Sequence, residues 1–373
     1  MKKRLLSAFM ALALCLTLLP APALAAETNV AEVTIDGKTT QYTDIVAAFD
    51  AAQLEASAAV KLLENVTIPK NAGYSYGIRL EKGNITLDLN GHTIQTTGGT
   101  SGFVPLDAVF YIEDGSSLTV QDKSTNGGGK IVQPNGGQAI GVSSGNLTVK
   151  SGIIEVTSDS ADADNATTTQ NCAVFVRGSG VADIQGGTLI GNRGIYVGGV
   201  WGGGTLTVSG APQIQGRNSY ALQVKDGTVT LSGGTYTGAE PCSIYNSDGT
   251  AASLLASGCR FESEGKESAY SEDGKGVVGN TTVAPRPANE YAYIGKDGTA
   301  QTQANCTEIT AETWDISQGW HVVKENVTIS GLNISGEVNL ILCDGATLTV
   351  TSLPYERCSR QHTEPFLAVR RKR

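Results

Sequence analysis

The sequence predicts an all-β solenoid, in which short strands stack in successive rungs, and two observations lead to this prediction. A phrase of three apolar runs separated by Gly-rich turns recurs from about residue 77 to about residue 275. Its clearest copy occupies residues 139–142, 145–149 and 152–156. The chain also contains 46 glycines, and only 17% of its residues are charged. A period of about 20 to 50 residues is the signature of stacked repeats, because one repeat cannot bury its apolar face alone.

The segment before the repeats, residues 27–76, has a different pattern and is expected to form an N-terminal cap. Residues 31–35 are predicted to form a strand that ends at the turn Asp36-Gly37. Thr43 or Asp44 can then begin a helix, whose apolar residues follow at helical spacing as Ile45, Val46, Phe49 and Ala52. An amphipathic helix suits this place, because the first rung of a stack has an exposed apolar end and open strand edges.

The repeats themselves, residues 77–283, are expected to form eight rungs. These rungs begin near residues 77, 108, 139, 173, 194, 221, 243 and 269. About 21 residues are enough for three strands of four or five residues and their turns, so the longer rungs contain extra loop. Neighbouring rungs would pair in parallel at roughly 4.8 Å, with inward apolar residues such as Ile140, Val142 and Leu147 in one continuous core.

Residues 30–280 resemble a known family. The three strands per rung, the helical cap and the phrase Ile85-Thr86-Leu87-Asp88-Leu89-Asn90-Gly91-His92-Thr93-Ile94 are similar to the pectate-lyase-like proteins. In particular, they resemble the non-catalytic surface proteins that Gram-positive gut-type bacteria secrete. This resemblance implies a right-handed parallel β-helix, but a fold of this kind does not by itself imply a function.

The first residues are expected to be a secretory signal peptide, residues 1–25. Lys2, Lys3 and Arg4 precede an apolar stretch, and Ala23-Leu24-Ala25 is a small-residue cleavage site. The mature protein is therefore expected to be secreted or extracellular, with cell-surface association as a further option. No other apolar stretch is long enough to span a membrane.

The C-terminal part is expected to contain a second module. Residues 284–290 form a linker around Pro285-Arg286-Pro287, and residues 291–351 begin another β-rich module. In residues 352–373 the alternation stops and the chain becomes basic. A frameshift or truncation explains this tail, and a basic tail that binds anionic wall polymer is the alternative.

Composition argues against several classes of partner and cofactor. The formal net charge of −9 disfavours nucleic acid, which needs clustered Lys and Arg. The cysteines and histidines have no zinc-ligand spacing, and Asp-Gly pairs that could suggest calcium are typical of tight turns. We therefore expect no metal and no cofactor.

One outward row is the candidate for chemistry. Alignment of the first strand of each rung gives the row Arg79, Tyr111, Gly141, Phe175, Tyr196, Gln223 and Tyr245. The row contains no carboxylate, whereas glycoside hydrolysis needs a carboxylate pair at a defined separation. This argues against both polysaccharide lyases and glycoside hydrolases.

The aromatic members of the row, together with Trp201, are the candidate ligand-binding residues. Tyr111, Phe175, Tyr196 and Tyr245 could form an exposed stripe against which sugar rings pack. Tyr196 is expected to contribute most, since Phe175 lies one rung before it and Trp201 follows it closely. Alternatively, the rings stack on one another along the sheet or lie under the loop at residues 158–171.

These observations favour a non-enzymatic protein module with an adhesion, spacer or glycan-contact role. Its expected partner is a polysaccharide, or a glycan of the host or the cell wall. The alternatives are a polysaccharide lyase or glycoside hydrolase of the β-helix class and a truncated fragment without function. The enzyme class would be favoured by two carboxylates, or a carboxylate and an arginine, within about 10 Å on one outer face.

Overall fold

The chain divides into two compact units, Met1–Ala284 (unit 1) and Pro285–Arg373 (unit 2). A computed structural model describes residues 28–69, 76–97, 108–113, 115–134, 136–157, 171–199, 202–239, 241–287, 289–295, 299–343, 345–351 and 368–370. The predicted signal peptide, Trp201 and most of residues 352–373 lie outside these ranges. Within the described part, no helix is both long and apolar enough to cross a membrane.

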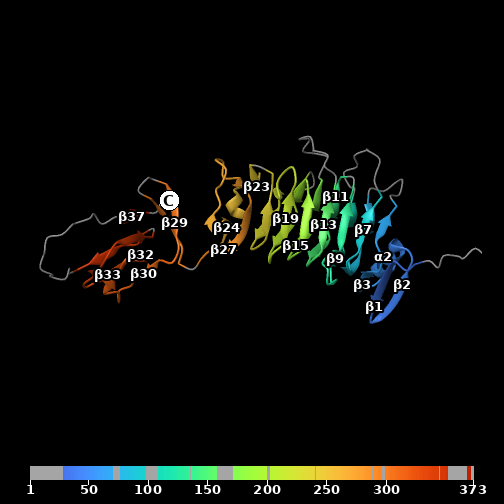
Figure 1. The fold of residues 1–373 in the computed structure, drawn as a ribbon, viewed down its shortest axis with the longest axis horizontal. Coiled ribbons are helices and arrows are strands. Elements are labelled where there is room, and N and C mark those ends of the chain that lie inside the picture. The colour runs from blue at the N-terminus through green and yellow to red at the C-terminus, as the bar shows by residue number, and fades with distance from the viewer. Residues whose placement is uncertain are drawn as a thin grey trace, which may run out of the picture. The chain divides into compact units, whose positions relative to one another are not determined.

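Three long sheets make up unit 1, and Figure 1 shows their strands stacked one after another along it. Sheet A has the order β2 (Lys38–Tyr42), β1 (Ala31–Ile35), β3 (Ser57–Leu62), β6 (Gly83–Asp88), β9 (Ser116–Gln121), β12 (Asn146–Val149), β15 (Val181–Ile184), β18 (Thr205–Val208) and β21 (Thr228–Leu231). Sheet B has the order β25 (Lys266–Glu267), β24 (Cys259–Ser263), β27 (Thr281–Pro285), β22 (Thr235–Thr237), β19 (Gln213–Gly216), β16 (Thr188–Gly191), β13 (Ile153–Val156), β10 (Lys130–Gln133), β7 (Thr93–Thr96) and β4 (Val66–Ile68). Sheet C has the order β26 (Gly276–Val278), β23 (Cys242–Asn246), β20 (Leu222–Val224), β17 (Arg193–Val197), β14 (Cys172–Val176), β11 (Gln138–Val142), β8 (Ala108–Ile112) and β5 (Tyr76–Leu80).

The chain visits the three sheets in turn. From β5 to β22 it passes from sheet C to sheet A to sheet B and returns to sheet C, three strands at a time. Each strand of one round pairs in parallel with its counterpart in the next, for example β8 with β11 and β11 with β14. The prediction of an almost all-β chain built from long parallel sheets is therefore confirmed. This order is compatible with a solenoid.

The inward side chains of these strands form one apolar cluster. Ile140 and Val142 are fully buried and Leu147 is 1% exposed, as the alternation of the sequence predicts. Glycine is required at some of the turns between strands. Gly152 has a φ of +97°, and a Cβ added there would lie 2.7 Å from the Cδ1 atom of Leu89. The turn can therefore approach the core only without a side chain.

One turn is fixed by the carboxylate of Asp122. Its Oδ1 accepts hydrogen bonds from the backbone N–H groups of Gly91 (2.9 Å) and Ser124 (3.1 Å), and its Oδ2 accepts one from Gly129 (2.7 Å). Burial acts to raise the pKa of Asp122, but its hydrogen bonds with the backbone N–H groups of Gly129, Ser124 and Gly91 bring the pKa below its ordinary value of 3.8. The ionised carboxylate thus links the turn that follows β6, at Gly91, to the turn that follows β9, at Ser124 and Gly129.

The helix α2 (Ile45–Gln53) lies before the repeats, where the sequence predicts a helix. Asp44 caps it by accepting hydrogen bonds at Oδ1 from the backbone N–H groups of Val46 (2.7 Å) and Ala47 (3.0 Å). Its buried face includes Phe49, whose ring lies 5.3 Å from that of Phe110 in an edge-to-face contact. The helix therefore shares its apolar core with the strands of unit 1.

The last part of unit 1 departs from the predicted eight rungs. The strand β26 is antiparallel to β23, and β27 is antiparallel to β22. A short 3₁₀ helix, η1 (Ala251–Leu254), follows β23. The cause is a two-residue turn at Glu264 (φ 52°) and Gly265 (φ 77°), which folds β25 back antiparallel onto β24. The expected rung near residue 269 is therefore wrong: this segment does not continue the parallel stack.

Unit 2 begins with the antiparallel hairpin of β28 (Tyr291–Ile294) and β29 (Ala300–Gln303). Three parallel groups of strands follow. The first group has the order β30 (Thr307–Glu308), β32 (Gly319–Val323), β35 (Val338–Leu342) and β37 (Ala368–Arg370). In the second group, β31 (Asp315–Ile316) pairs with β34 (Asn333–Ile334). In the third group, β33 (Val327–Ile329) pairs with β36 (Leu348–Val350). From β32 to β36 the chain again visits three groups in turn, so unit 2 repeats the plan of unit 1 over fewer strands.

Candidate functional site

The outward row of sheet C is a continuous ladder of register partners. Consecutive strands β5, β8, β11, β14, β17, β20 and β23 place in one line Arg79, Tyr111, Gly141, Phe175, Tyr196, Gln223 and Tyr245. These are the residues that the sequence alignment puts in one row. The rungs of sheet C thus have the register that the repeats predict.

Three of the aromatic side chains in this row are buried. Tyr111, Phe175 and Tyr196 are each 4% exposed, so the expectation of an exposed stripe is wrong for these three. The absent side chain at Gly141 is one reason: a Cβ added there would lie 3.0 Å from Cδ2 of Tyr111, so the Tyr111 ring lies across this glycine. Tyr196 and Phe175 pack together with ring centroids 5.4 Å apart.

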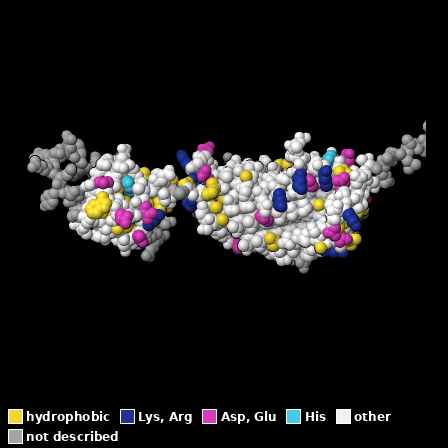
Figure 2. Space-filling view, turned by 90° about the horizontal axis from the view of Figure 1, so that it is seen from below, with side chains coloured by type: hydrophobic (Ala, Val, Ile, Leu, Met, Phe, Trp, Pro, Cys, Tyr) yellow, Lys and Arg dark blue, Asp and Glu magenta, His cyan; other side chains and the backbone are white. Residues whose placement is uncertain are grey.

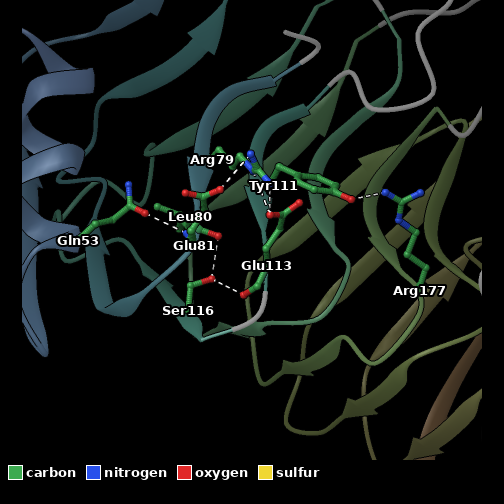
Figure 3. Close-up of polar contacts among 8 residues, drawn as sticks. All are labelled: Gln53, Arg79, Leu80, Glu81, Tyr111, Glu113, Ser116 and Arg177. Atoms are coloured by element: carbon green, nitrogen blue, oxygen red, sulfur yellow. Dashed lines mark hydrogen bonds and ion pairs between the residues drawn. The ribbon is translucent and has the colours of Figure 1, made fainter.

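Arg177 lies beside these rings and was not expected from the sequence. It is 5% exposed, and its guanidinium donates a hydrogen bond to the hydroxyl of Tyr111 (Figure 3). The Cζ atom of Arg177 lies 5.5 Å from the ring centroid of Tyr111 and 5.4 Å from that of Phe175, within the range of cation–π contacts. Its position two residues after Phe175, on the same side of the strand, is the signal that could have found it.

A second arginine, Arg193, contacts the next two residues of the row, Tyr196 and Gln223. The Cζ atom of Arg193 lies 5.7 Å from the ring centroid of Tyr196, and its Nε donates a hydrogen bond to Oε1 of Gln223. Cys172 contributes to the same buried cluster as Phe175 and Tyr196. This middle part of the row is therefore a packed layer.

Tyr245, at the far end of the row, differs from the other rings. It is partly exposed and stacks on Tyr220, which is also partly exposed; their centroids are 5.1 Å apart and their planes differ by 16°. Gln223 is the register partner of Tyr245 and is partly exposed as well. Tyr220 was missed from the sequence because it precedes the strand β20. Trp201, the remaining candidate, lies outside the described residues.

The other end of the row carries a charged group, the Arg79 cluster, which consists of Arg79, Glu81 and Glu113 (Figure 3). Nη1 of Arg79 lies 2.9 Å from Oε1 of Glu81, and its Nη2 forms an ion pair with Oε2 of Glu113. The three side chains are 40%, 58% and 28% exposed in the order Arg79, Glu81, Glu113. Two carboxylates and an arginine thus share one outer face, which the row alone did not predict, since both acids lie two residues beyond it.

The backbone around the Arg79 cluster is fixed by neighbouring polar side chains. Oε1 of Gln53, in α2, accepts a hydrogen bond from the backbone N–H of Glu81 at 2.9 Å. Ser116 is 1% exposed, and its Oγ donates to the carbonyl oxygens of Leu80 (3.0 Å) and Glu113 (2.6 Å) (Figure 3). These hydrogen bonds therefore fix the backbone at the ends of β5 and β8, directly before Glu81 and at Glu113.

Metal-ligating residues do not gather elsewhere in the described chain. No group of three His, Cys, Asp or Glu side chains in the described ranges could hold a metal ion. On the face of unit 1 in Figure 2, charged side chains lie mostly toward one end, and the rest of the face is largely other side chains and backbone. Comparisons of the chain with models of known families, with curated proteins and with solved structures found no match.

Proposed function

We propose that unit 1 winds as a right-handed parallel β-helix, that α2 caps its first rung, and that the protein is secreted. The cyclic visit to three parallel sheets supports the solenoid. The packing of Phe49 against Phe110 supports the cap, because it covers apolar side chains that the first strands would otherwise expose. The basic start and apolar stretch of residues 1–25 support secretion.

Within this architecture, the protein acts as a non-enzymatic extracellular module that contacts polysaccharide through the outer face of sheet C. The observation that carries this proposal is the stacked pair of Tyr220 and Tyr245, which is partly exposed. Aromatic rings offer a large flat area at low cost in side-chain entropy, and sugar rings pack against such faces. Gln223 lies beside Tyr245 in the row and adds an amide that can bond sugar hydroxyls.

The buried rings of the row support this contact indirectly. Tyr111, Phe175 and Tyr196 hold Arg177 and Arg193, and Arg193 in turn bonds Gln223. A binding surface is most effective when its side chains are already fixed, because less entropy is lost on binding. The packed middle of the row therefore orients the exposed end.

The test is a glycan array with the secreted protein, followed by affinity measurements on any polysaccharide that binds. Removing a ring contact of about 0.5–1.5 kcal/mol in Tyr245→Ala or Tyr220→Ala is expected to weaken binding by up to roughly tenfold. Trp314→Ala is the control, since Trp314 is 59% exposed and belongs to unit 2. A protein that binds no polysaccharide, or one that loses as much affinity in Trp314→Ala, would refute the contact and leave the spacer role.

The second candidate is a polysaccharide-degrading enzyme, and the Arg79 cluster is the observation in its favour. Two carboxylates on one outer face are what a glycosidase uses. However, the guanidinium of Arg79 contacts both carboxylates and so occupies the space between them, where the scissile bond would have to lie. Release of reducing ends or unsaturated products from polygalacturonate or neutral polysaccharides, abolished by Glu113→Gln, would establish the enzyme; no release from either excludes it for these substrates.

A further inference from the structure

The hydrogen bond between Arg193 and Gln223 fixes which way the side-chain amide of Gln223 faces. An arginine side chain carries N–H donors and no acceptor. The atom of Gln223 that meets Nε of Arg193 must therefore be its oxygen, Oε1. Because the amide is planar, its NH2 group at Nε2 then points away from Arg193.

Arg193 is itself held in place by the buried part of the row. Its Cζ atom lies 5.7 Å from the ring centroid of Tyr196, which is 4% exposed. A guanidinium over an aromatic ring is stabilised by the cation–π contact. The packed layer beneath the surface therefore sets the orientation of the Gln223 amide before any ligand arrives, which lowers the entropy lost on binding.

The NH2 group of Gln223 is a hydrogen-bond donor beside the exposed aromatic pair. Gln223 is partly exposed, and within the described ranges its Nε2 donates to no protein atom. Its register partner on β23 is Tyr245, which stacks on Tyr220. A ligand that packs on the Tyr245 ring is thus met by an N–H group and should carry an acceptor next to its apolar surface.

We propose that the polysaccharide at this surface contains N-acetylated amino sugars. The acetamido carbonyl accepts a hydrogen bond from Nε2 of Gln223, and the acetamido methyl group packs on the Tyr245 ring. This inference rests on the proposed glycan contact and names the class of sugar that the contact takes. An acetamido group joins an acceptor to an apolar methyl group, and so matches a donor that lies beside an aromatic ring.

Acidic sugars also carry acceptors, but the charges around this surface do not favour them. Asp226 and Asp248 each follow one of the two strands, β20 and β23, by two residues, and they offset the positive charges of Lys225 and Arg193. The whole chain has a formal net charge of −9. Like charges oppose association, whereas an acetamido group is neutral.

Chitohexaose and cellohexaose test this inference, because they share a backbone and differ in whether each ring carries an acetamido group or a hydroxyl group. Calorimetric titration of the full secreted chain should show that chitohexaose binds about tenfold more tightly, since one stronger acceptor and one packed methyl group are added. On a glycan array, the polysaccharides that bind should be those with acetamido groups.

The decisive variant is Gln223→Glu, which replaces the NH2 group by an oxygen that only accepts and keeps the pairing with Arg193. The affinity for chitohexaose should fall by about tenfold, and the affinity for cellohexaose should not fall. Gln215→Glu is the matched control, because Gln215 is an exposed glutamine on β19 in sheet B. A preference for chitohexaose that survives in Gln223→Glu, or is lost equally in Gln215→Glu, overturns the role of Gln223.

Arg193 acts here as a positioning residue, and a ratio of affinities tests it separately from stability. Arg193→Met removes the donor that orients Gln223 and should abolish the preference for chitohexaose over cellohexaose. Arg193→Lys keeps a donor without an acceptor and should retain the preference. An unchanged ratio in Arg193→Met would show that the arginine does not orient the amide.

The outcomes also separate this inference from the glycan contact itself. Tyr245→Ala should weaken the binding of both hexasaccharides, because its ring packs against any sugar. Binding that is lost in Tyr245→Ala, but is as tight for cellohexaose or an acidic polysaccharide as for chitohexaose, overturns the acetamido inference and keeps the contact. A wild type that binds no polysaccharide overturns both.

Discussion

Units 1 and 2 are built on the same plan but differ in what closes their ends. In unit 1 the helix α2 packs on the first strands, and antiparallel strands and η1 follow the last parallel ones. In unit 2 the inward residues of β34 and β36 remain partly exposed. The difference teaches that parallel stacking buries the apolar side chains between strands, whereas separate segments are needed to cover those at the ends of the stack.

The largest expected effect comes from a charge in the middle of unit 1. Val142→Asp buries an unpaired carboxylate at a position that is fully buried, and such a charge has no compensation. We expect no soluble secreted protein. Ile334→Asp is the comparison in unit 2, and it should be tolerated because Ile334 is already 45% exposed. Normal melting of Val142→Asp would contradict the rung assignment, and unfolding by Ile334→Asp would contradict the exposed position of Ile334.

A smaller effect is expected from the closing elements. Phe49→Ala removes a fully buried ring from α2 and its contact with Phe110, which should cost about 3–5 kcal/mol of unfolding free energy. Leu348→Ala in β36 of unit 2 should cost less than about 2 kcal/mol of unfolding free energy, since Leu348 is only partly buried. Denaturant unfolding of each variant measures both values. Equal costs would show that the end of unit 2 is as well covered as the start of unit 1.

Much of the fold could be predicted because the repeats carry their own register. The glycine turns and the alternation around Ile140 and Val142 place the strands, and the row from Arg79 to Tyr245 follows from aligning them. The antiparallel end of unit 1 could not be read in this way, because β24 and β26 contain apolar residues like any rung. The pair Glu264-Gly265, in which both residues have positive φ, makes the tight turn that folds β25 back onto β24.

The candidate site was harder to predict than the fold, because outward side chains are not constrained by the core. The row predicts which rings neighbour each other but not whether they are covered. Burial of Tyr111 depends on the missing side chain of Gly141 and on Arg177, which directly follows β14, the strand two places away in sheet C. The carboxylates of the Arg79 cluster lie beyond the aligned strand positions, so a search restricted to the row could not find them.

The smallest expected effect, and the sharpest contrast between the two units, lies in their response to pH. The pKa of Asp122 in unit 1 is lowered below 3.8, so its contribution to stability is present above the ordinary pKa and is lost as the pH falls through the lower folded value. In unit 2, hydrogen bonds to Glu308 and Tyr291 raise the pKa of Lys324 to about 12, from an ordinary value of 10.5. Its contribution is therefore present below pH 10.5 and is lost as the pH rises through about 12.

Asp122→Asn tests this contrast, because the amide cannot ionise and presents a donor where the carboxylate accepts. The variant should melt below the wild type at pH 7, and the difference in melting temperature should narrow as the pH falls from 3.8 through the lower pKa of the folded state. Asp50→Asn, on the exposed side of α2, is the control for the substitution itself and should melt close to the wild type at pH 7. A gap for Asp122→Asn that stays constant from pH 7 to pH 2 would mean that the hydrogen bonds to its carboxylate do not depend on its charge.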